Sequence, residues 1–325
     1  MMFGDVEVSG MSETTIIPLL DLGPFLAGEP GALEATAARL REINETVGFL
    51  YIANHGVPQS LIDATFDATR RFHAQPTDDK LAVKVDATMQ GYLPMRGSTT
   101  RSSTIAVNTK PNENEAFFLK RDSDRWPEGV PGFRETTQAY YAATEALAQR
   151  MLPLYAVALD LPPDYFDAKC TEPMSTLRLT HYPAMAAYAE GTFGIAPHTD
   201  SGFITLLAQN KVPGLQIRLT DGQWIDAPVV AGTFIVNTGN VLHRWTNGRF
   251  LSTPHRAFNT SNEPRYAIPY FFHPNADTVI ECLPTCLTTS LGTEPVQDPI
   301  TVADYMAWFR GQNYNHLRKP EAVAA

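Results

Sequence analysis

His198, Asp200 and His255 together offer two imidazoles and one carboxylate to a single metal ion. A set of this kind fills one face of an octahedral Fe(II) and leaves the opposite positions open for a cosubstrate and O2. Side chains i and i+2 of a strand point to the same face, so His198 and Asp200 can bind one ion while Thr199 points away. We expect His255 to come from a neighbouring strand. The pattern predicts oxidative chemistry at an iron centre.

Arg265 lies ten residues after His255, at the start of an apolar run, residues 265–272. An unpaired guanidinium would be costly to bury there, and its planar pair of donors suits a carboxylate. Zinc is the alternative metal, because it occupies sets of two histidines and one acidic residue in some hydrolases. We expect iron, since Arg265 points to a carboxylate ligand near the metal. The alternative role of Arg265 is a structural salt bridge at a strand end.

Short strands are predicted between and around the metal ligands. Apolar runs alternate with turn signals, such as Asp-Gly at 221–222 and Asn-Gly at 247–248. Strands at intervals of roughly ten residues suit a double-sheet jelly roll or barrel, with the metal site in its mouth. The predicted strands are residues 203–209, 214–219, 223–226, 233–237 and 250–258.

Seven stretches of the chain carry motifs of one known family, in that family's order. Among them are Pro-His-Thr-Asp at 197–200, Pro-His-Arg at 254–256 and Arg-Tyr-Ala at 265–267. From about residue 15 to about residue 275, the chain resembles the iron(II)/2-oxoglutarate-dependent dioxygenases of the isopenicillin N synthase-like family. The stretches are residues 48–58, 177–183, 196–200, 212–216, 245–249, 252–256 and 265–267.

The resemblance implies a fold and a set of residue roles. The fold would be mainly β with flanking helices: a double-stranded β-helix, or jelly roll, buttressed by N-terminal and C-terminal helices. His198, Asp200 and His255 would bind Fe(II), at which O2 reacts. Arg265 and Tyr182 would bind the distal carboxylate of the cosubstrate 2-oxoglutarate. The alternative role of Tyr182 is that of a core tyrosine with a satisfied hydroxyl.

The chain departs from the family at Ala267, where a serine hydroxyl usually donates a second hydrogen bond to the cosubstrate carboxylate. The loss is about 1 kcal/mol, unless Tyr182, Thr180 or a water molecule substitutes. Two further histidines are expected outside the ligand set. Strand alternation points His181 to the other face, and His243 lies in a strand-like stretch near a triad that is already complete.

Substrate contacts are expected from aromatic and basic residues near the mouth. Phe118, Phe193 and Phe271 are candidates for an apolar wall beside the iron, with core packing as their alternative role. Arg96 or Arg101 could meet an anionic substrate, with solvated surface charge as the alternative. Both arginines lie in residues 84–131, a stretch rich in polar residues, Gly and Pro. We expect this stretch to form loops that act as a lid.

The pattern of helices and strands divides the chain into five regions of one structural unit. Helices are predicted at residues 32–47, 59–73, 135–159 and 302–311. The expected regions are a disordered extension at 1–14, an N-terminal dioxygenase region of helices, short strands and lid-like loops at 15–131, a long bracing helix and connection at 132–174, the Fe(II)/2-oxoglutarate jelly-roll core at 175–279, and a C-terminal helix and tail at 280–325.

The composition argues against several classes of partner. The net charge of -10 disfavours nucleic acid and anionic membranes, which are bound mainly through Lys and Arg. No apolar run approaches the roughly 20 residues of a membrane span, and residues 1–10 lack the pattern of a secretory signal. The three cysteines are expected to be free thiols. We expect a cytoplasmic protein with a small-molecule substrate, monomeric or weakly homo-oligomeric.

The expected reaction is the oxidation of a small organic metabolite, coupled to oxidative decarboxylation of 2-oxoglutarate. Hydroxylation is the usual outcome in the family, and desaturation and cyclisation use the same chemistry. Two alternatives stay open. One is an isopenicillin N synthase-like Fe(II) oxidase that needs no 2-oxoglutarate, and the other is a non-catalytic ligand-binding protein on the jelly-roll fold.

Overall fold

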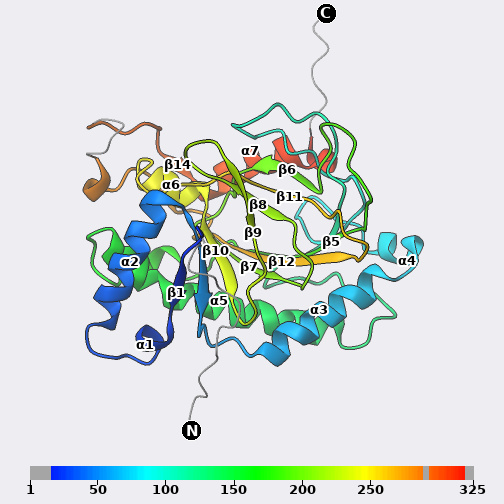
Figure 1. Ribbon diagram of the computed structural model, residues 1–325, viewed down its shortest axis with the longest axis horizontal. Coiled ribbons are helices and arrows are strands. Elements are labelled where there is room, and N and C mark those ends of the chain that lie inside the picture. Colours follow the sequence, from blue (N-terminus) through cyan, green and yellow to red (C-terminus); the bar gives the residue numbers. More distant parts are fainter. Residues whose placement is uncertain (1–15, 288–292, 319–325) are drawn as a thin grey trace, which may run out of the picture.

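An eight-stranded sheet forms one half of the core in this computed structural model, which describes residues 16–287 and 293–318 (Figure 1). The expected extension at 1–14 lies outside the described residues. In spatial order the strands are β1 (Leu19–Asp21), β2 (Phe49–Ala53), β10 (Phe234–Thr238), β7 (Ile204–Gln209), β12 (Arg265–Phe272), β5 (Thr176–Tyr182), β4 (Glu115–Leu119) and β3 (Gly91–Leu93). Neighbours are antiparallel, except that β1 and β2 run parallel.

A four-stranded antiparallel sheet faces the eight-stranded sheet across an internal cavity. Its strands are β6 (Ile195–His198), β11 (His255–Ala257), β8 (Leu215–Arg218) and β9 (Trp224–Ala227). A separate pair consists of β13 (Val279–Ile280) and β14 (Ile300–Thr301). Strands β7, β8, β9 and β10 lie at the predicted positions. The expected jelly-roll core with flanking helices is confirmed.

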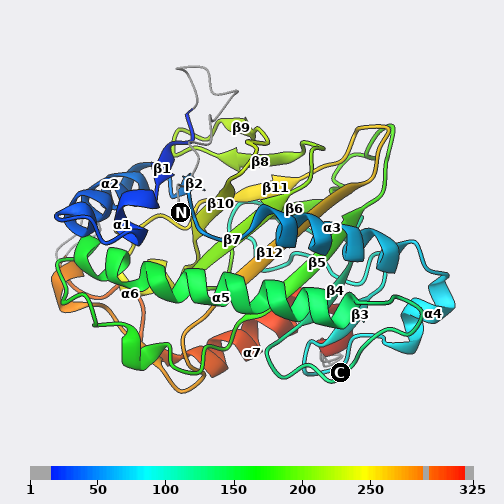
Figure 2. The same cartoon turned by 90° about the horizontal axis from the view of Figure 1, so that it is seen from below.

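Helices cover the outer face of the larger sheet, where α3 and α5 cross β12 (Figure 2). The helices are α1 (Gly23–Leu26), α2 (Ala32–Thr46), α3 (Gln59–His73), α4 (Thr77–Ala82), α5 (Phe133–Ala158), α6 (Asn240–Trp245) and α7 (Val302–Asn313). The predicted helices correspond to α2, α3, α5 and α7. Among the described helices, none has the length and apolar character needed to cross a bilayer. The three cysteines are unbridged, as predicted.

The predictions for two segments, residues 250–258 and the stretch around His243, are wrong. The sequence predicts a strand at 250–258, but β11 covers only His255–Ala257. The stretch around His243 is the helix α6, not a strand. Val241, Leu242 and Trp245 are its buried residues. Their spacing places all three on one face of a helix, which explains why this apolar segment is helical.

The stretch 84–131 contains strands as well as loops. Its residues include β3 and β4, which form one edge of the larger sheet because β4 pairs with β5. Phe117 and Phe118 of β4 are fully buried. The prediction of loops is therefore wrong for these two segments, and the part that can act as a lid is shorter than the composition suggests.

Candidate active site

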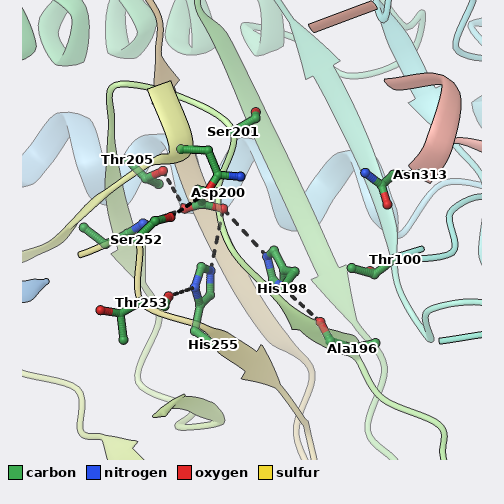
Figure 3. Close-up of polar contacts among 12 residues, drawn as sticks. Thr100, Ala196, His198, Asp200, Ser201, Thr205, Ser252, Thr253, His255 and Asn313 are labelled. Atoms are coloured by element: carbon green, nitrogen blue, oxygen red, sulfur yellow. Dashed lines mark hydrogen bonds and ion pairs between the residues drawn. The ribbon is translucent and has the colours of Figure 1, made fainter. Parts of the chain in front are cut away.

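Three side chains with metal-ligand atoms meet between the two sheets (Figure 3). His198 is the last residue of β6, His255 is the first residue of β11, and the two are paired in the strand register. The Nε2 atoms of His198 and His255 lie 3.7 and 3.6 Å from Oδ1 of Asp200. The candidate ligand atoms all lie within 4.8 Å of one another. One ion can therefore contact all three residues.

Asp200 reaches the histidines from beyond the end of a strand. Asp200 does lie beside His198, as the sequence predicts, but strand alternation is not the reason, because β6 ends at His198. Instead, Thr205 of β7 and Asn237 of β10 donate hydrogen bonds to Oδ2 of Asp200, at 2.6 and 2.8 Å. The backbone N–H of Asn240 also donates to the Asp200 carbonyl, at 2.7 Å. These bonds leave Oδ1 facing the two imidazoles.

Backbone carbonyls determine which imidazole nitrogen faces the carboxylate. Nδ1 of His198 bonds to the carbonyl of Ala196 at 2.9 Å, and Nδ1 of His255 bonds to that of Thr253 at 3.2 Å (Figure 3). A carbonyl only accepts, so each Nδ1 donates, and in a neutral ring Nε2 then keeps its lone pair. Burial, and then the neighbouring His255, lower the pKa of His198 to about 3. The ring of His198 is therefore neutral at neutral pH.

The ionised state of Asp200 complements the neutral ring of His198. Burial would raise the pKa of Asp200, but the positive charge of the two imidazoles when they are protonated and the two hydrogen bonds to Oδ2 outweigh burial and hold the pKa below its usual value. The site thus combines imidazole lone pairs with an ionised carboxylate. This is the donor set that suits a mononuclear Fe(II).

Arg265 of β12 is a buried cation. It is 1% exposed and pairs with Tyr182 in the strand register. Nη2 donates to Oε1 of Gln209 at 2.9 Å, while Nε and Nη1 are buried without a hydrogen-bond partner in the described part of the chain. The guanidinium lies 4.8 Å from the centre of the Tyr182 ring. Among the described residues no carboxylate pairs with Arg265, so the salt-bridge alternative has no partner there.

A cavity connects Arg265 to the three candidate metal ligands. We call it the Arg265 cavity; its walls come from both sheets and include Tyr182, Arg265 and Ala267 as well as the candidate ligands. Burial lowers the pKa of Arg265, yet an arginine stays charged at neutral pH. Its unpartnered N–H groups fit a carboxylate held at one part of the cavity. The residues present therefore fit both Fe(II) and a dicarboxylate beside it.

Comparison with known proteins identifies the family. Residues 173–274 match the 2OG-Fe(II) oxygenase superfamily, and residues 17–138 match the N-terminal region described as non-haem dioxygenase in morphine synthesis. The 2-oxoglutarate-Fe(II) type oxidoreductase hxnY of Emericella nidulans is 34% identical over 324 residues, which cover 92% of this chain and 91% of that protein. This chain belongs to the 2OG-Fe(II) oxygenase superfamily.

Other relatives of this 2OG-Fe(II) oxygenase support the same cofactors. Homoarginine-6-hydroxylase 2-ODD-C23 of Glycine max is 31% identical over 304 residues, covering 86% of this chain and 91% of that protein. A full-length Neurospora crassa protein, solved with alpha-KG (2-oxoglutarate) and thymine, has a TM-score of 0.80 and 28% identity, covering 94% and 98% of the two chains. The oxygenase is an oxidoreductase that uses Fe(II) and 2-oxoglutarate.

Ala267 lies in the Arg265 cavity, where the family's serine hydroxyl is expected. Ala267 pairs with Thr180 of β5 in the strand register, and residues paired in this way point to the same face. The Thr180 hydroxyl is buried without a hydrogen-bond partner in the described part of the oxygenase. Thr180 is therefore a candidate for replacing the missing donor.

A second cavity lies beside the candidate metal ligands on the side of α7, and we call it the α7 cavity. Phe118 of β4 and Phe271 of β12 line it, together with His198 and Asp200. Both phenylalanines thus lie where the sequence predicts an apolar wall. Their contact with a substrate stays a prediction.

The other three candidate substrate residues lie outside the walls of both cavities. The Phe193 ring packs on Phe258, with ring centres 5.3 Å apart. Arg96, whose side chain is 64% exposed, donates to Glu113 at 3.0 Å. Arg101 is half-buried. The structure therefore does not bring Phe193, Arg96 or Arg101 to the site, because these side chains have other surroundings.

The sequence analysis missed several residues of the site. Thr205 and Asn237, which orient Asp200, carry no spacing signal. Arg178 lines both cavities, and strand alternation places it on the same face as Tyr182, four residues later. Strand alternation alone therefore predicts that Arg178 faces the site. Residues of α7 also line the α7 cavity, and no local pattern reveals this long-range contact.

A second group of ligand-type residues, His73, Glu115 and His181, has its ligand atoms within 4.8 Å of one another. Here Lys80 donates to one oxygen of Glu115 at 2.8 Å, and Tyr92 donates to the same oxygen. Burial would raise the pKa of Glu115, but interactions with His181, His73 and Lys80 hold it well below its usual value. This group is a buried hydrogen-bond network, and we assign no metal to it. His181 points away from the active site, as strand alternation predicts.

Proposed function

We propose that His198, Asp200 and His255 hold the Fe(II) of this oxygenase. The observation that carries the proposal is the convergence of two Nε2 atoms on Oδ1 of Asp200, at 3.7 and 3.6 Å. Oδ2 is engaged by two donors, so Oδ1 is the free oxygen. Partners of this kind orient the ligands of metal sites and keep histidines in the metal-binding tautomer.

In this proposal Arg265 and Tyr182 hold the distal carboxylate of 2-oxoglutarate. Nε and Nη1 of Arg265 are buried and unpartnered, and an incoming carboxylate would satisfy both the charge and the hydrogen bonds. The Tyr182 side chain lies beside the guanidinium and lines the same cavity. A dicarboxylate anchored here extends toward the three candidate ligands within one cavity.

When bound, Fe(II) and 2-oxoglutarate supply an oxidative decarboxylation that activates O2 for attack on a substrate C–H bond. The residues of the chain position the reactants. The carbonyls of Ala196 and Thr253 keep each Nε2 available, and Arg265 neutralises the carboxylate that the cosubstrate brings into a buried cavity. Apolar side chains such as Phe118 and Phe271 exclude water from the space beside the ligands.

The substrate in this proposal is a small organic molecule, and hydroxylation is the expected outcome. The α7 cavity is a concave, mostly apolar site that adjoins the candidate ligands, and sites of this kind bind small molecules. One relative is named a homoarginine-6-hydroxylase, and the Neurospora crassa protein was solved with thymine bound. Homoarginine and thymine are both small molecules. The net charge of -10 disfavours nucleic acid as a partner.

Anaerobic titration tests the assignment of the ligands. Fe(II) and then 2-oxoglutarate are added while the absorption band of their complex is followed, and succinate is measured after O2 is admitted. Alanine variants of His198, Asp200 and His255 should lose the band and the succinate while keeping the native circular dichroism. His316→Ala, which changes an exposed histidine outside both cavities, should behave like the native chain. Near-native Fe(II) affinity in Asp200→Ala would overturn the assignment.

A further inference from the structure

The α7 cavity contains two arginines beside an apolar wall. Arg178 comes from β5 and Arg310 from the last turn of α7, and Phe118 and Phe271 line the same cavity. Asp200 is the only carboxylate among the described residues of its wall, and it faces the two imidazoles. The cavity therefore offers positive charge that the described residues do not neutralise.

Arg178 is buried with unused hydrogen-bonding capacity. The residue is 7% exposed; Nη2 donates to Oδ1 of Asn114 at 2.7 Å, while Nε has no hydrogen-bond partner in the described part of the chain. Its guanidinium lies 5.4 Å from the centre of the Phe118 ring. No carboxylate of the described residues forms an ion pair with Arg178. A buried cation without a counter-ion is costly, so a ligand anion would stabilise this arrangement.

Arg310 adds a second cation to the same cavity. It is half-buried, and its guanidinium makes no hydrogen bond or ion pair with the residues that the structure describes. Burial, and then the charge of Arg310, lower the pKa of the lining residue His273 to about 4. His273 is therefore neutral at neutral pH. The positive charge on the cavity wall then resides on the two arginines.

We propose that Arg178 and Arg310 bind a carboxylate group of the substrate, so that the substrate is an organic acid with an apolar body. The proposal rests on the function proposed above. Planar guanidinium groups suit a carboxylate, and the apolar wall suits a hydrocarbon or aromatic body. Because His198 and Asp200 line the same cavity, an acid anchored by the arginines lies beside the metal site. Arg178 and Arg310 take the role that the sequence analysis assigns to Arg96 or Arg101.

Matched pairs of ligands test this proposal. The protein is loaded anaerobically with Fe(II) and 2-oxoglutarate, and calorimetry compares a panel of alkanoic and arylalkanoic acids with their primary amides. We expect acids of the panel to bind at least about tenfold more tightly than their amides, the size of one charge-assisted hydrogen bond. Arg178→Met and Arg310→Met should each remove most of this preference, and Arg310→Lys should retain part of it.

A control variant and a second measurement make the result decisive. Arg244→Met changes a half-buried arginine of α6 outside both cavities and should keep the preference for acids. Arg310 lines the α7 cavity and not the Arg265 cavity, so Arg310→Met should keep the native 2-oxoglutarate affinity. A native protein that binds no 2-oxoglutarate would instead contradict the function on which the proposal rests.

Three results would overturn the proposal itself. Acids and amides could bind equally throughout the panel, or the preference for acids could survive in both arginine-to-methionine variants. Phosphate monoesters could also bind more tightly than carboxylates of the same body, which would assign the two arginines to a different anion. Circular dichroism of each variant ensures that a loss of binding is not a loss of fold.

Discussion

The two oxygens of Asp200 have different partners, and this difference leads to the first prediction. Thr205→Val should weaken Fe(II) binding without removing a ligand. The Thr205 hydroxyl donates to Oδ2 at 2.6 Å, and without it the carboxylate is less firmly oriented. Loss of such a supporting bond typically costs about tenfold or more in metal affinity. Anaerobic Fe(II) titration measures the change.

Thr46→Val on α2 is the matched control for this prediction. It also removes a threonine hydroxyl, which bonds to the carbonyl of Glu42 within its own helix. Its Fe(II) affinity should equal that of the native chain. Equal weakening in the Thr46 and Thr205 variants would contradict an orienting role for Thr205.

The position of Ala267 yields a second prediction about single residues. Arg265→Ala should weaken 2-oxoglutarate binding by about 3 kcal/mol, roughly a hundredfold, because a charge-assisted bidentate contact is lost. Ala267→Ser should tighten it by at most about 1.5 kcal/mol, provided the new hydroxyl displaces no well-placed water. Spectral titration of the Fe(II) complex measures both. An unchanged 2-oxoglutarate affinity in Arg265→Ala would contradict the role of Arg265 in binding the cosubstrate carboxylate.

Thr180 offers a third variant in the same titration. If its buried hydroxyl replaces the missing serine, Thr180→Val should weaken 2-oxoglutarate by about 1 kcal/mol, and Ala267→Ser in the same chain should restore the affinity. An unchanged affinity in Thr180→Val would mean that the family's second donor is absent here and that Arg265 is the main anchor.

The sequence reveals some residues of the site better than others. His198, Asp200 and His255 can be found from type and spacing, since few other roles require that combination. Arg178 can be found by alternation along the strand that holds Tyr182. Arg310 cannot, because its approach to the cavity depends on where α7 packs, and packing between distant segments leaves no periodic signal.

At the scale of elements, the alternation of apolar and polar residues predicts the strands of the jelly roll, and it fails where a segment is short and apolar. Helix α6 has six residues, and so short a segment does not distinguish the helical from the strand periodicity of apolar residues. The strand-based explanation for the position of Asp200, in the turn after β6, fails for a different reason. The side chain of Asp200 is oriented by hydrogen bonds from two other strands, and no local pattern contains that information.

The buried network around Glu115 joins α4, β4 and β5 and leads to a prediction about stability. Lys80→Met should lower the free energy of unfolding by about 3 kcal/mol or more, because a buried carboxylate loses its ammonium partner at 2.8 Å. Chemical denaturation near neutral pH measures it. Lys84→Met, which changes an exposed lysine two residues after α4, should stay within about 0.5 kcal/mol of the native chain. Equal losses in both variants would contradict the role of the network.

The loop at residues 98–102, part of the stretch predicted to act as a lid, is hydrogen-bonded to the end of α7. Oδ1 of Asn313 accepts from the backbone N–H groups of Arg101 and Ser102, at 2.9 and 3.1 Å. Asn313→Ala should therefore speed hydrogen exchange in 98–102 while leaving β5 and β12 protected. Mass spectrometry of exchange at the peptide level measures this. Unchanged protection of 98–102 would mean that α7 does not hold the lid.

At the scale of the whole molecule, one continuous core joins the N-terminal helices to the larger sheet. It includes Leu40 of α2, Phe72 of α3, Tyr155 of α5 and Ile268 of β12. The division of the chain into five regions stays a prediction. Periodicity reports which residues of a segment are buried and does not report what covers them. The sequence therefore predicts the helices and strands but not which of them share a core.

Burial of neutral histidines leads to a last prediction, which concerns the stability of the whole chain in acid. Burial lowers the pKa values of His55 and His273 from 6.5 to about 4. Nδ1 of His55 accepts a hydrogen bond from the backbone N–H of Val57 at 3.2 Å, and protonation of that nitrogen would break the bond. Between pH 6.5 and about 4, the unfolded chain therefore binds more protons than the folded chain.

This difference fixes the sign of the pH dependence. The stability that the neutral rings provide is present above pH 6.5 and falls as the pH drops toward about 4. For each histidine the pKa in the unfolded chain exceeds that in the folded chain by roughly 2.5, which corresponds to about 3 kcal/mol. We expect His55→Asn, whose amide oxygen can accept the same hydrogen bond, to lose stability less steeply between about pH 6.5 and about pH 4.5. Chemical denaturation of the metal-free protein across this range measures the slopes. Identical slopes for the native chain and His55→Asn would show that the proton enters elsewhere.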